Sequence, residues 1–339
     1  MKLAGPLRAA IRRVSAPYAI LILMVAVLAV LPAVSHYSVT ATNVYDVLQN
    51  FASLGLVALA LGTTMIAGEF DLSVTSMYLL GAMVAVLTGA PSPVAGVLLA
   101  LAVALGVGLI QGGVIAGLRL NSMPVTLGGY LILLGTTYIL GHNQTVTYAN
   151  YSVGLRLDQP ILSIFSIRSF VSIGIFAVAA LVMAYTRVGR DIHAIGGDRR
   201  ASRIAGVRVA RVVIGVFVAS ALMTALAGAL LGYSLSTASP TIAVNQLTFA
   251  ATAALLGGVS LAGGRGSPLG IAAGVLTLSI IQELLGILGA ASYVQSLVTG
   301  GVLVAVASVQ GLPAALARMR SLTAWRRPAA PPSSTAADA

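Results

Sequence analysis

Apolar segments of membrane-spanning length recur along most of the chain, separated by short polar breaks. A helix that crosses a bilayer needs about 20 predominantly apolar residues, with a range of about 17–25. The alternation typical of strands is absent, so the pattern indicates spanning helices rather than a barrel. We predict ten such segments, at residues 18–35, 47–67, 72–90, 94–118, 122–141, 169–186, 212–233, 246–262, 268–289 and 293–311.

The weakest of these segments is 246–262, which is short and glycine-rich at its end, where Gly257, Gly258, Gly263 and Gly264 lie. Non-helical backbone at membrane depth is tolerated only where protein covers it or where it lines a cavity. We therefore predict a broken or re-entrant helix here. The predicted fold class is an all-α integral membrane protein, a polytopic bundle of about ten transmembrane helices.

The arginines predict the sidedness of the chain. Basic residues gather in the N-terminal arm 1–17, at Arg119, in the segment 187–211 and in the tail 312–339. Basic loops lie on the cytoplasmic side of a membrane. Four, two and four predicted spans separate these basic segments. Each number is even, so the chain returns to the same side of the membrane at every basic segment. Both termini are thus predicted to be cytoplasmic, with a disordered, low-complexity tail.

Composition supports this and excludes several functions. The chain is 58% hydrophobic and 8% charged, with mean hydropathy +0.99, whereas soluble domains carry about 25% charged residues. Its net charge of +11 is almost all arginine in loops and tails, which indicates orientation rather than nucleic-acid binding. The single lysine is Lys2. A phosphate-binding loop needs a lysine after its glycines, so we expect this chain not to hydrolyse ATP.

The most informative polar segment is 187–211, which holds seven of the nineteen basic residues. Gly196 and Gly197 are predicted to break the chain, and Asp198 to cap a helix start. Residues 199–205 can form about two helical turns, and Gly206 is a plausible stop. A short helix in a cytoplasmic loop is typical of a docking element. The alternative is a solvated loop whose arginines only set topology.

Acidic residues are few, and three of them lie in or between apolar runs. Asp71 can cap a helix running from Leu72, so it and Glu69 are interpreted as a structural corner. Glu283 lies inside a predicted span, where a carboxylate is costly and usually faces a cavity or a partner. The three histidines have no metal-ligand spacing, and no catalytic set can be argued from the residues. We expect no metal, no cofactor and no enzymatic activity.

Three segments together resemble the permease subunits of bacterial ATP-binding-cassette importers of the ribose type. They are GEFDLSVTSMYLLGAMVAVLTG at 68–89, the stretch 193–230 and the stretch 247–281, in the order and spacing of that family. The first contains the family's Asp-Leu-Ser motif, here with Glu69, Asp71 and Ser73. The resemblance implies that residues 193–207 dock on the ATPase subunit. The residues assigned to this contact are Ile195, Gly196, Gly197, Asp198, Arg199, Arg200, Arg203, Ile204 and Gly206.

The resemblance also implies an inner-membrane permease domain at 18–311 and several partners. These are an ATPase subunit on the cytoplasmic side, an extracytoplasmic solute-binding protein, and a second permease subunit in a homodimer or heterodimer. The implied solute is a small polar molecule, most often a monosaccharide. Polar or aromatic residues within spans are candidates to line its path: Asn50, Phe51, Thr126, Gln282 and Glu283.

The sequence leaves other functions open. Glu69-Phe70 stands where the family often has a glycine and an aliphatic residue, and Gln282-Glu283 where it often has amides, so the solute could instead be a nucleoside or an amino acid. A stand-alone, ion-coupled transporter could relay protons through Glu69, Asp71 and Glu283. Such a function would not explain the folded, arginine-rich segment 187–211. A membrane enzyme or scaffold has no catalytic set to support it.

Overall fold

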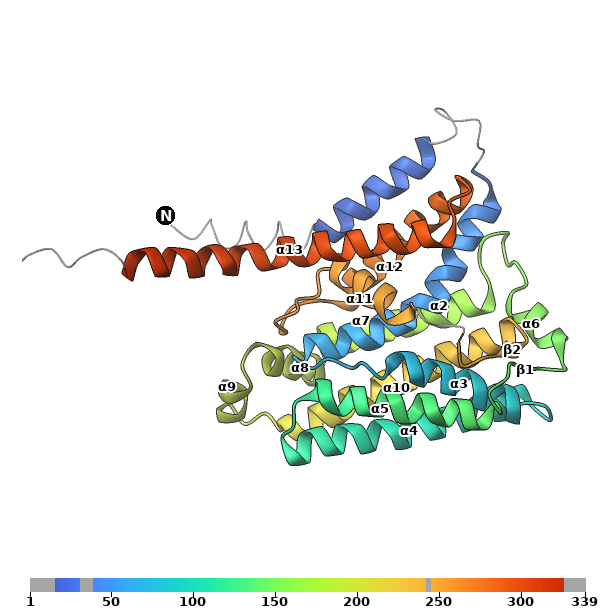
Figure 1. Cartoon of the computed structure of the whole chain (residues 1–339), viewed down its shortest axis with the longest axis horizontal. Coiled ribbons are helices and arrows are strands. Elements are labelled where there is room, and N and C mark those ends of the chain that lie inside the picture. Colours follow the sequence, from blue (N-terminus) through green and yellow to red (C-terminus); the bar gives the residue numbers. More distant parts are fainter. Residues whose placement is uncertain (1–15, 31–38, 242–244, 326–339) are drawn as a thin grey trace, which may run out of the picture.

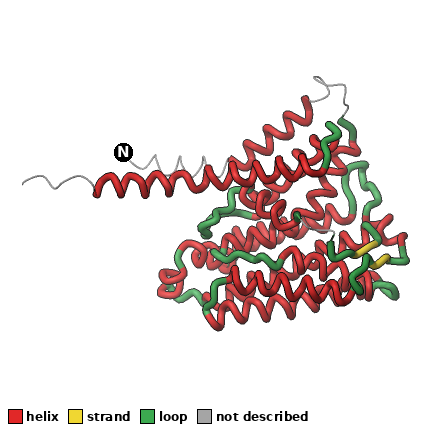
Figure 2. The backbone as a smooth tube through the Cα atoms, viewed as in Figure 1, coloured by secondary structure: helices red, strands yellow, loops and turns green. Residues whose placement is uncertain are grey.

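The computed structural model describes residues 16–30, 39–241 and 245–325, and it is helical almost throughout (Figures 1 and 2). The first described helix is Ala16–Val30. The other elements are α2 (Ala41–Ile66), α3 (Val74–Thr88), α4 (Pro93–Leu118), α5 (Ser122–Leu140), β1 (Val146–Thr147), α6 (Tyr151–Leu157), α7 (Ile167–Tyr185), α8 (Arg187–Gly197), α9 (Arg199–Ile204), α10 (Val209–Ser234), β2 (Thr237–Ala238), α11 (Gln246–Leu256), α12 (Pro268–Ile287) and α13 (Ser292–Trp325).

Seven of the described helices are long and apolar enough to cross a bilayer: α2, α4, α5, α7, α10, α12 and the Ser292–Gln310 part of α13. Three shorter apolar helices accompany them: Ala16–Val30, α3 and α11. The prediction of a polytopic helical membrane protein is confirmed. The count of ten stays a prediction, because α3 has 15 residues and α11 only 11, fewer than the ~17 that a span usually needs.

Several predicted boundaries differ from the structure; α2, for example, begins at Ala41 and not at 47. α11 ends at Leu256, six residues before the predicted end at 262, because the two following glycines leave the helix, Gly258 with φ +82°. α13 continues to Trp325 instead of ending at 311, so its helix covers the first part of the predicted tail. That part is rich in Ala, Leu, Met and Arg, which are strong helix formers. The rest of the tail and nearly all of the arm 1–17 lie outside the described residues.

The core is built around α2, whose second half is buried on every side. α10 packs along α4, α3 and α2, while α11 and α12 cover another face of α2. Figure 1 shows α13 along one edge of the bundle and α4 and α5 along the opposite edge. The outward faces of α4 and α5 expose large apolar side chains such as Ile110 and Ile132, which is the surface that lipid tails solvate.

The polar connections gather at two opposite ends of the bundle (Figure 1). At one end, here called the α9 end, lie α8, α9 and the connections 67–73 and 257–267. The other end, here called the β end, holds α6 and the strands β1 and β2, which pair antiparallel with Val146 opposite Ala238. The segment 142–167, between α5 and α7, thus contains a strand and a short helix. α2 and α10 run between the two ends.

The contact between α3 and α10 depends on glycine, and this predicts a first result. A Cβ on Gly228 would lie 1.9 Å from the Tyr78 carbonyl oxygen, so the two backbones touch there. We expect Gly228→Ala to destabilise the purified protein by about 1–3 kcal/mol, since overpacking forces the helices apart. Gly215→Ala is the matched control on the same helix, because nothing lies within 4 Å of its Cβ position. Thermal unfolding in detergent measures both, and equal midpoints for the two variants would contradict the prediction.

Candidate coupling site

The segment 187–211, predicted to be a loop with one short helix, forms two helices in sequence. α8 starts after Thr186, whose hydroxyl accepts a hydrogen bond from Gly189 N at 3.3 Å. Gly196 and Gly197 form the last turn of α8, so the prediction that they break the chain is wrong. The break comes at Asp198, which has extended φ and ψ of −156° and 108°. The glycines stay helical because tertiary packing, described below, offsets their low helix propensity.

The predicted short helix and its cap are confirmed in α9. The Asp198 carboxylate accepts hydrogen bonds from the backbone N–H groups of Arg200 at 2.8 Å and Ala201 at 3.0 Å. These are two of the N–H groups that a helix start leaves unpaired. α9 ends at Ile204, one residue before the predicted end, and Gly206 follows with φ +86°. Glycine adopts this left-handed backbone without steric cost.

Glycines bring three chain segments into direct backbone contact at the α9 end. Gly264 N donates a hydrogen bond of 2.9 Å to the carbonyl of Ile66, the last residue of α2. A Cβ on Gly196 of α8 would lie 1.9 Å from that same oxygen and 2.5 Å from Gly264 N. A Cβ on Gly263 would lie 2.8 Å from the Cα of Gly68. We call these four glycines, 68, 196, 263 and 264, the glycine junction; it joins the end of α2, α8 and the connection 257–267.

His193 reinforces this junction, although the sequence indicates only a loop histidine there. Its ring lies between α8 and the connection 257–267, with Nδ1 2.8 Å from Gly189 O and Nε2 3.0 Å from Gly266 O. The nearest signal in the sequence is that His193 follows Gly189 by four residues, one helical turn. Nothing in the sequence indicates the contact with Gly266.

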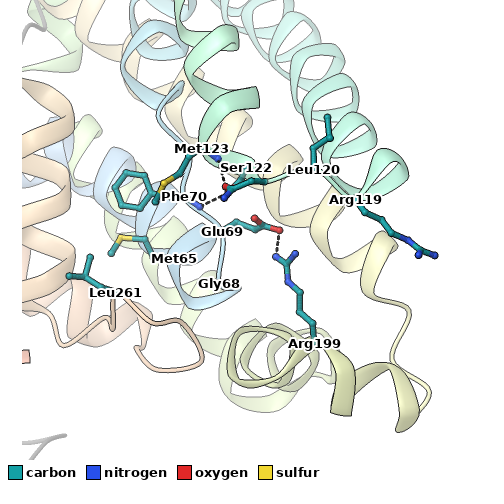
Figure 3. A pocket seen from close by; sticks show the side chains of 11 residues that line it. Met65, Gly68, Glu69, Phe70, Arg119, Leu120, Ser122, Met123, Arg199 and Leu261 are labelled. Carbon is teal, nitrogen blue, oxygen red and sulfur yellow. Dashed lines mark hydrogen bonds and ion pairs between the residues drawn. The ribbon is translucent and has the colours of Figure 1, made fainter. Parts of the chain in front are cut away.

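An ion pair ties α9 to the α2–α3 connection (Figure 3). The Arg199 guanidinium donates to the Glu69 carboxylate, and the Glu69 side chain is only 4% exposed while that of Arg199 is 41% exposed. The pair lies beside a cleft of about 450 Å³, also lined by Phe70, Arg119 and Ser122. The sequence indicates that Glu69 belongs to a structural corner at the start of α3. The structure shows that this corner contacts α9 through the ion pair with Arg199.

The comparisons with known proteins identify the family. The family model described as branched-chain amino acid transport system / permease component matches residues 43–307. The chain belongs to this permease family. An L-arabinose ABC transporter permease protein of Azospirillum brasilense is 30% identical over 273 residues, which cover 78% of each chain. The ribose import permease protein of Escherichia coli K12 is 29% identical, covering 82% of this chain and 88% of its own. No solved structure shows a significant match.

The Asp-Leu-Ser motif of the permease ties its connection 67–73 to α3 and α10. The Asp71 carboxylate is buried and accepts hydrogen bonds from Ser73 N at 3.0 Å, Ser73 Oγ at 2.6 Å and Ser220 Oγ at 2.8 Å. α3 begins at Val74 rather than at Leu72 as predicted, with Ser73 as its N-cap. Three donors thus satisfy this buried carboxylate, which pairs with no arginine among the described residues.

The residues predicted to line the solute path do not form one cluster. Asn50 and Phe51 lie on α2, where the Phe51 ring packs on Phe176 with centroids 5.1 Å apart. Thr126 lies beyond the opposite end of α2, where its hydroxyl contacts Phe70 O at 3.1 Å and Leu72 N at 3.1 Å. That geometry supports a role in positioning the connection 67–73.

The other two predicted path residues lie on α12, half-buried. The Glu283 carboxylate accepts a hydrogen bond of 2.8 Å from Asn43 Nδ2 in the first turn of α2. Glu283 thus faces a polar partner on another helix, one of the two surroundings predicted for a carboxylate in a span. Gln282 precedes it. A solute contact for any of these residues stays a prediction.

The predicted ATPase-contact residues of the permease divide into two groups. Ile195 is 2% exposed and faces the bundle, so it packs rather than docks. Arg200 and Arg203 are exposed, and Ile204 is 82% exposed at the end of α9. Ile204 therefore presents a large apolar side chain on the surface of α9, next to the exposed Arg203.

Proposed function

We propose that this permease is the membrane subunit of an ATP-binding-cassette importer that carries a monosaccharide. The observation that carries the proposal is similarity to L-arabinose and ribose permeases over about four fifths of the chain, combined with a projecting helix α9 that is ion-paired to the α2–α3 connection beside the end of α2. The family description names branched-chain amino acids. The sugar permeases match most of the chain, so a monosaccharide is the favoured solute and an amino acid or a nucleoside is the alternative.

A separate ATPase subunit supplies the energy and docks on α9. The sequence has no lysine except Lys2 and so no phosphate-binding loop. α9 is the mechanical input because Arg199 pairs with Glu69 in the α2–α3 connection, and because α8, which precedes α9, meets the end of α2 backbone to backbone at the glycine junction. Packed interiors transmit displacement because they have few voids to absorb it.

An ion-coupled transporter is less well supported. Glu69 is paired with Arg199. Asp71 accepts three hydrogen bonds and is walled off from solvent. A proton relay needs a chain of titratable groups that can pass a proton, and these carboxylates are held at one end of the bundle, away from Glu283.

In this proposal the α9 end faces the cytoplasm, together with both chain termini, because its arginines obey the positive-inside rule. The β end then faces outward, where a solute-binding protein delivers the sugar. A second permease subunit, identical or homologous, completes the pathway. The lipid-facing surface is the apolar outer side of helices such as α4 and α5.

The docking part of the proposal predicts the result of two substitutions. We expect Ile204→Asp to remove the ATPase subunit from the purified complex and to reduce uptake below about a tenth of the wild-type rate, since a charge at a buried anchor costs at least ~1.4 kcal/mol. Ile204→Leu is the matched control and keeps both. Co-purification and uptake in proteoliposomes measure the effect. If the complex assembles unchanged with Ile204→Asp, the ATPase subunit does not dock on this part of α9.

The solute part is tested separately. Proteoliposomes holding the permease, its ATPase and its binding protein are given labelled ribose, L-arabinose, a nucleoside and leucine in parallel. ATP-dependent uptake of a pentose supports the proposal. If only the nucleoside or only leucine is taken up, that compound is the solute and the monosaccharide proposal is wrong. Uptake driven by a pH gradient without the ATPase overturns the importer assignment.

A further inference from the structure

A buried ion pair lies at the β end, far from α9. Arg168, in the first turn of α7, holds its Nε atom 3.0 Å from Oδ1 of Asp158, the residue that ends α6. The Arg168 side chain is 6% exposed and that of Asp158 is 30% exposed. A charged pair taken out of water costs desolvation energy that its attraction only partly offsets. Such a pair is therefore weak evidence of a purely stabilising role.

The pair joins four elements. Arg168 Nη2 donates a hydrogen bond of 2.7 Å to Gln49 Oε1 on α2. The Ser234 hydroxyl, on the last residue of α10, donates to Asp158 Oδ2 at 2.5 Å. The Tyr45 hydroxyl on α2 donates to the Asp158 carbonyl. One guanidinium and one carboxylate thus hold α6 and α7 against the ends of α2 and α10.

This network is not fully satisfied. Arg168 Nη1, Gln49 Nε2 and Asp158 Oδ1 are buried and have no hydrogen-bond partner among the described residues, although Asp158 Oδ1 lies within ion-pair distance of Arg168. Buried donors without partners are rare in proteins, and each calls for an explanation. On the other side of the pair, Asp158 and Ser234 border a cleft of about 520 Å³ beneath α6. The ion pair thus combines incompletely hydrogen-bonded polar atoms with an adjoining cleft, as a contact that breaks and reforms would.

The same helices carry the network and the coupling site. α2 holds Gln49 near one end and ends at Ile66 in the glycine junction. α10 ends at Ser234 and begins at Val209, five residues after α9. A displacement of either helix at the α9 end therefore reaches the ion pair through continuous helical backbone.

We propose that Arg168 and Asp158 form the outer latch of the permease. Closed, the pair holds α6 across the ends of α2 and α10; its release opens the β end to the solute in step with α9. The inference rests on the proposed function for its direction of transport. The latch itself is a charge pair that controls access to the β end, and it consists of residues of this chain without any partner subunit.

The natural absence of cysteine allows a direct test. Ser172 lies one turn past Arg168 on α7 and is fully buried, and its hydroxyl donates to Ala52 O at 3.0 Å. Ser172→Cys reports access at the β end. Thr64→Cys, fully buried near the α9 end of α2, reports access at the other end. Each cysteine is placed in the otherwise wild-type permease and in latch variants, and maleimide labelling rates are measured on the purified protein.

The latch variants are Asp158→Asn, Arg168→Gln and the double variant, with Ser234→Ala as a milder one. We expect labelling at position 172 to accelerate by about tenfold in each single latch variant, which lies within the roughly twofold to hundredfold range over which contacting residues couple. The rate at position 64 stays unchanged. The double variant labels no faster than the faster single variant, since one pair is removed either way. Ser234→Ala shifts the rate in the same direction by less.

Three results would overturn the latch. Labelling at position 172 that stays at the wild-type rate shows that the pair does not control access. Equal acceleration at positions 172 and 64 shows general loosening, and multiplicative effects in the double variant show that the two residues act independently. Because labelling needs neither ATPase nor solute, its outcome is separate from the proposed function, which fails instead if wild-type proteoliposomes import no pentose.

Discussion

We expect Gly196→Ala to reduce uptake severely, whereas Gly197→Ala one residue later should leave it near the wild-type level. The added Cβ at position 196 would lie 1.9 Å from Ile66 O and 2.5 Å from Gly264 N, both backbone atoms that cannot rotate away. α8 must then move off the end of α2. Nothing lies within 4 Å of the corresponding Cβ position on Gly197. The two substitutions therefore add the same methyl group to the same helix and differ only in what it meets.

Uptake by reconstituted proteoliposomes measures this effect, and we expect a loss of at least about tenfold, because overpacking against backbone costs about 1–3 kcal/mol and 1.4 kcal/mol is a factor of ten. Amide hydrogen exchange over residues 187–204 provides a readout without partners. Exchange should accelerate for Gly196→Ala and not for Gly197→Ala. Equal uptake by both variants would show that the glycine junction does not carry the coupling.

The Glu69→Gln variant distinguishes docking of the ATPase subunit on α9 from transmission of α9 movement to the bundle. The Glu69 side chain is 4% exposed and out of reach of an ATPase subunit, so the complex should still assemble. Uptake should fall, because the negative charge that pairs with Arg199 and links α9 to the α2–α3 connection is lost. Removing one partner of a buried pair costs about 3–5 kcal/mol, and the partial exposure of Arg199 reduces this to about 1–3 kcal/mol of stability.

Arg199→Glu is expected to be more severe than Glu69→Gln, since it places two carboxylates together. The exchange Glu69→Arg with Arg199→Glu restores an opposite-charge pair and should recover part of the uptake. Arg200→Glu is the control for charge on α9, because Arg200 is exposed; its stability should change by no more than about 0.5 kcal/mol. Thermal unfolding, co-purification and uptake are measured together. Unchanged unfolding and uptake in Glu69→Gln would remove the ion pair from the coupling path.

Features that depend on short stretches of chain were predictable. The apolar runs predicted the spanning helices because lipid requires every backbone group to be paired within a helix. Asp198 and Gly206 predicted both ends of α9, since capping involves residues only two or three positions apart. The motif at Asp71 was also found, although the helix that follows it begins at Val74.

Features that depend on which distant segments meet were not predictable. Gly196 and Gly197 have the same propensity in sequence, and only the approach of Ile66 and Gly264 makes one of them indispensable. Glu69 and Arg199 are separated by 130 positions, and Asp158 and Arg168 pair only because α6 folds back on α7 and α10.

The sequence by itself thus determined that the chain lies in a membrane, where its helices form and that an arginine-rich segment projects from the bundle. It could do so because hydrophobicity, charge and capping act locally. The packing of α2 against α8, α10 and the connection 257–267 decided which glycines touch and which charges pair. Those contacts follow from shape and distance among helices, and no short segment of the sequence contains that information.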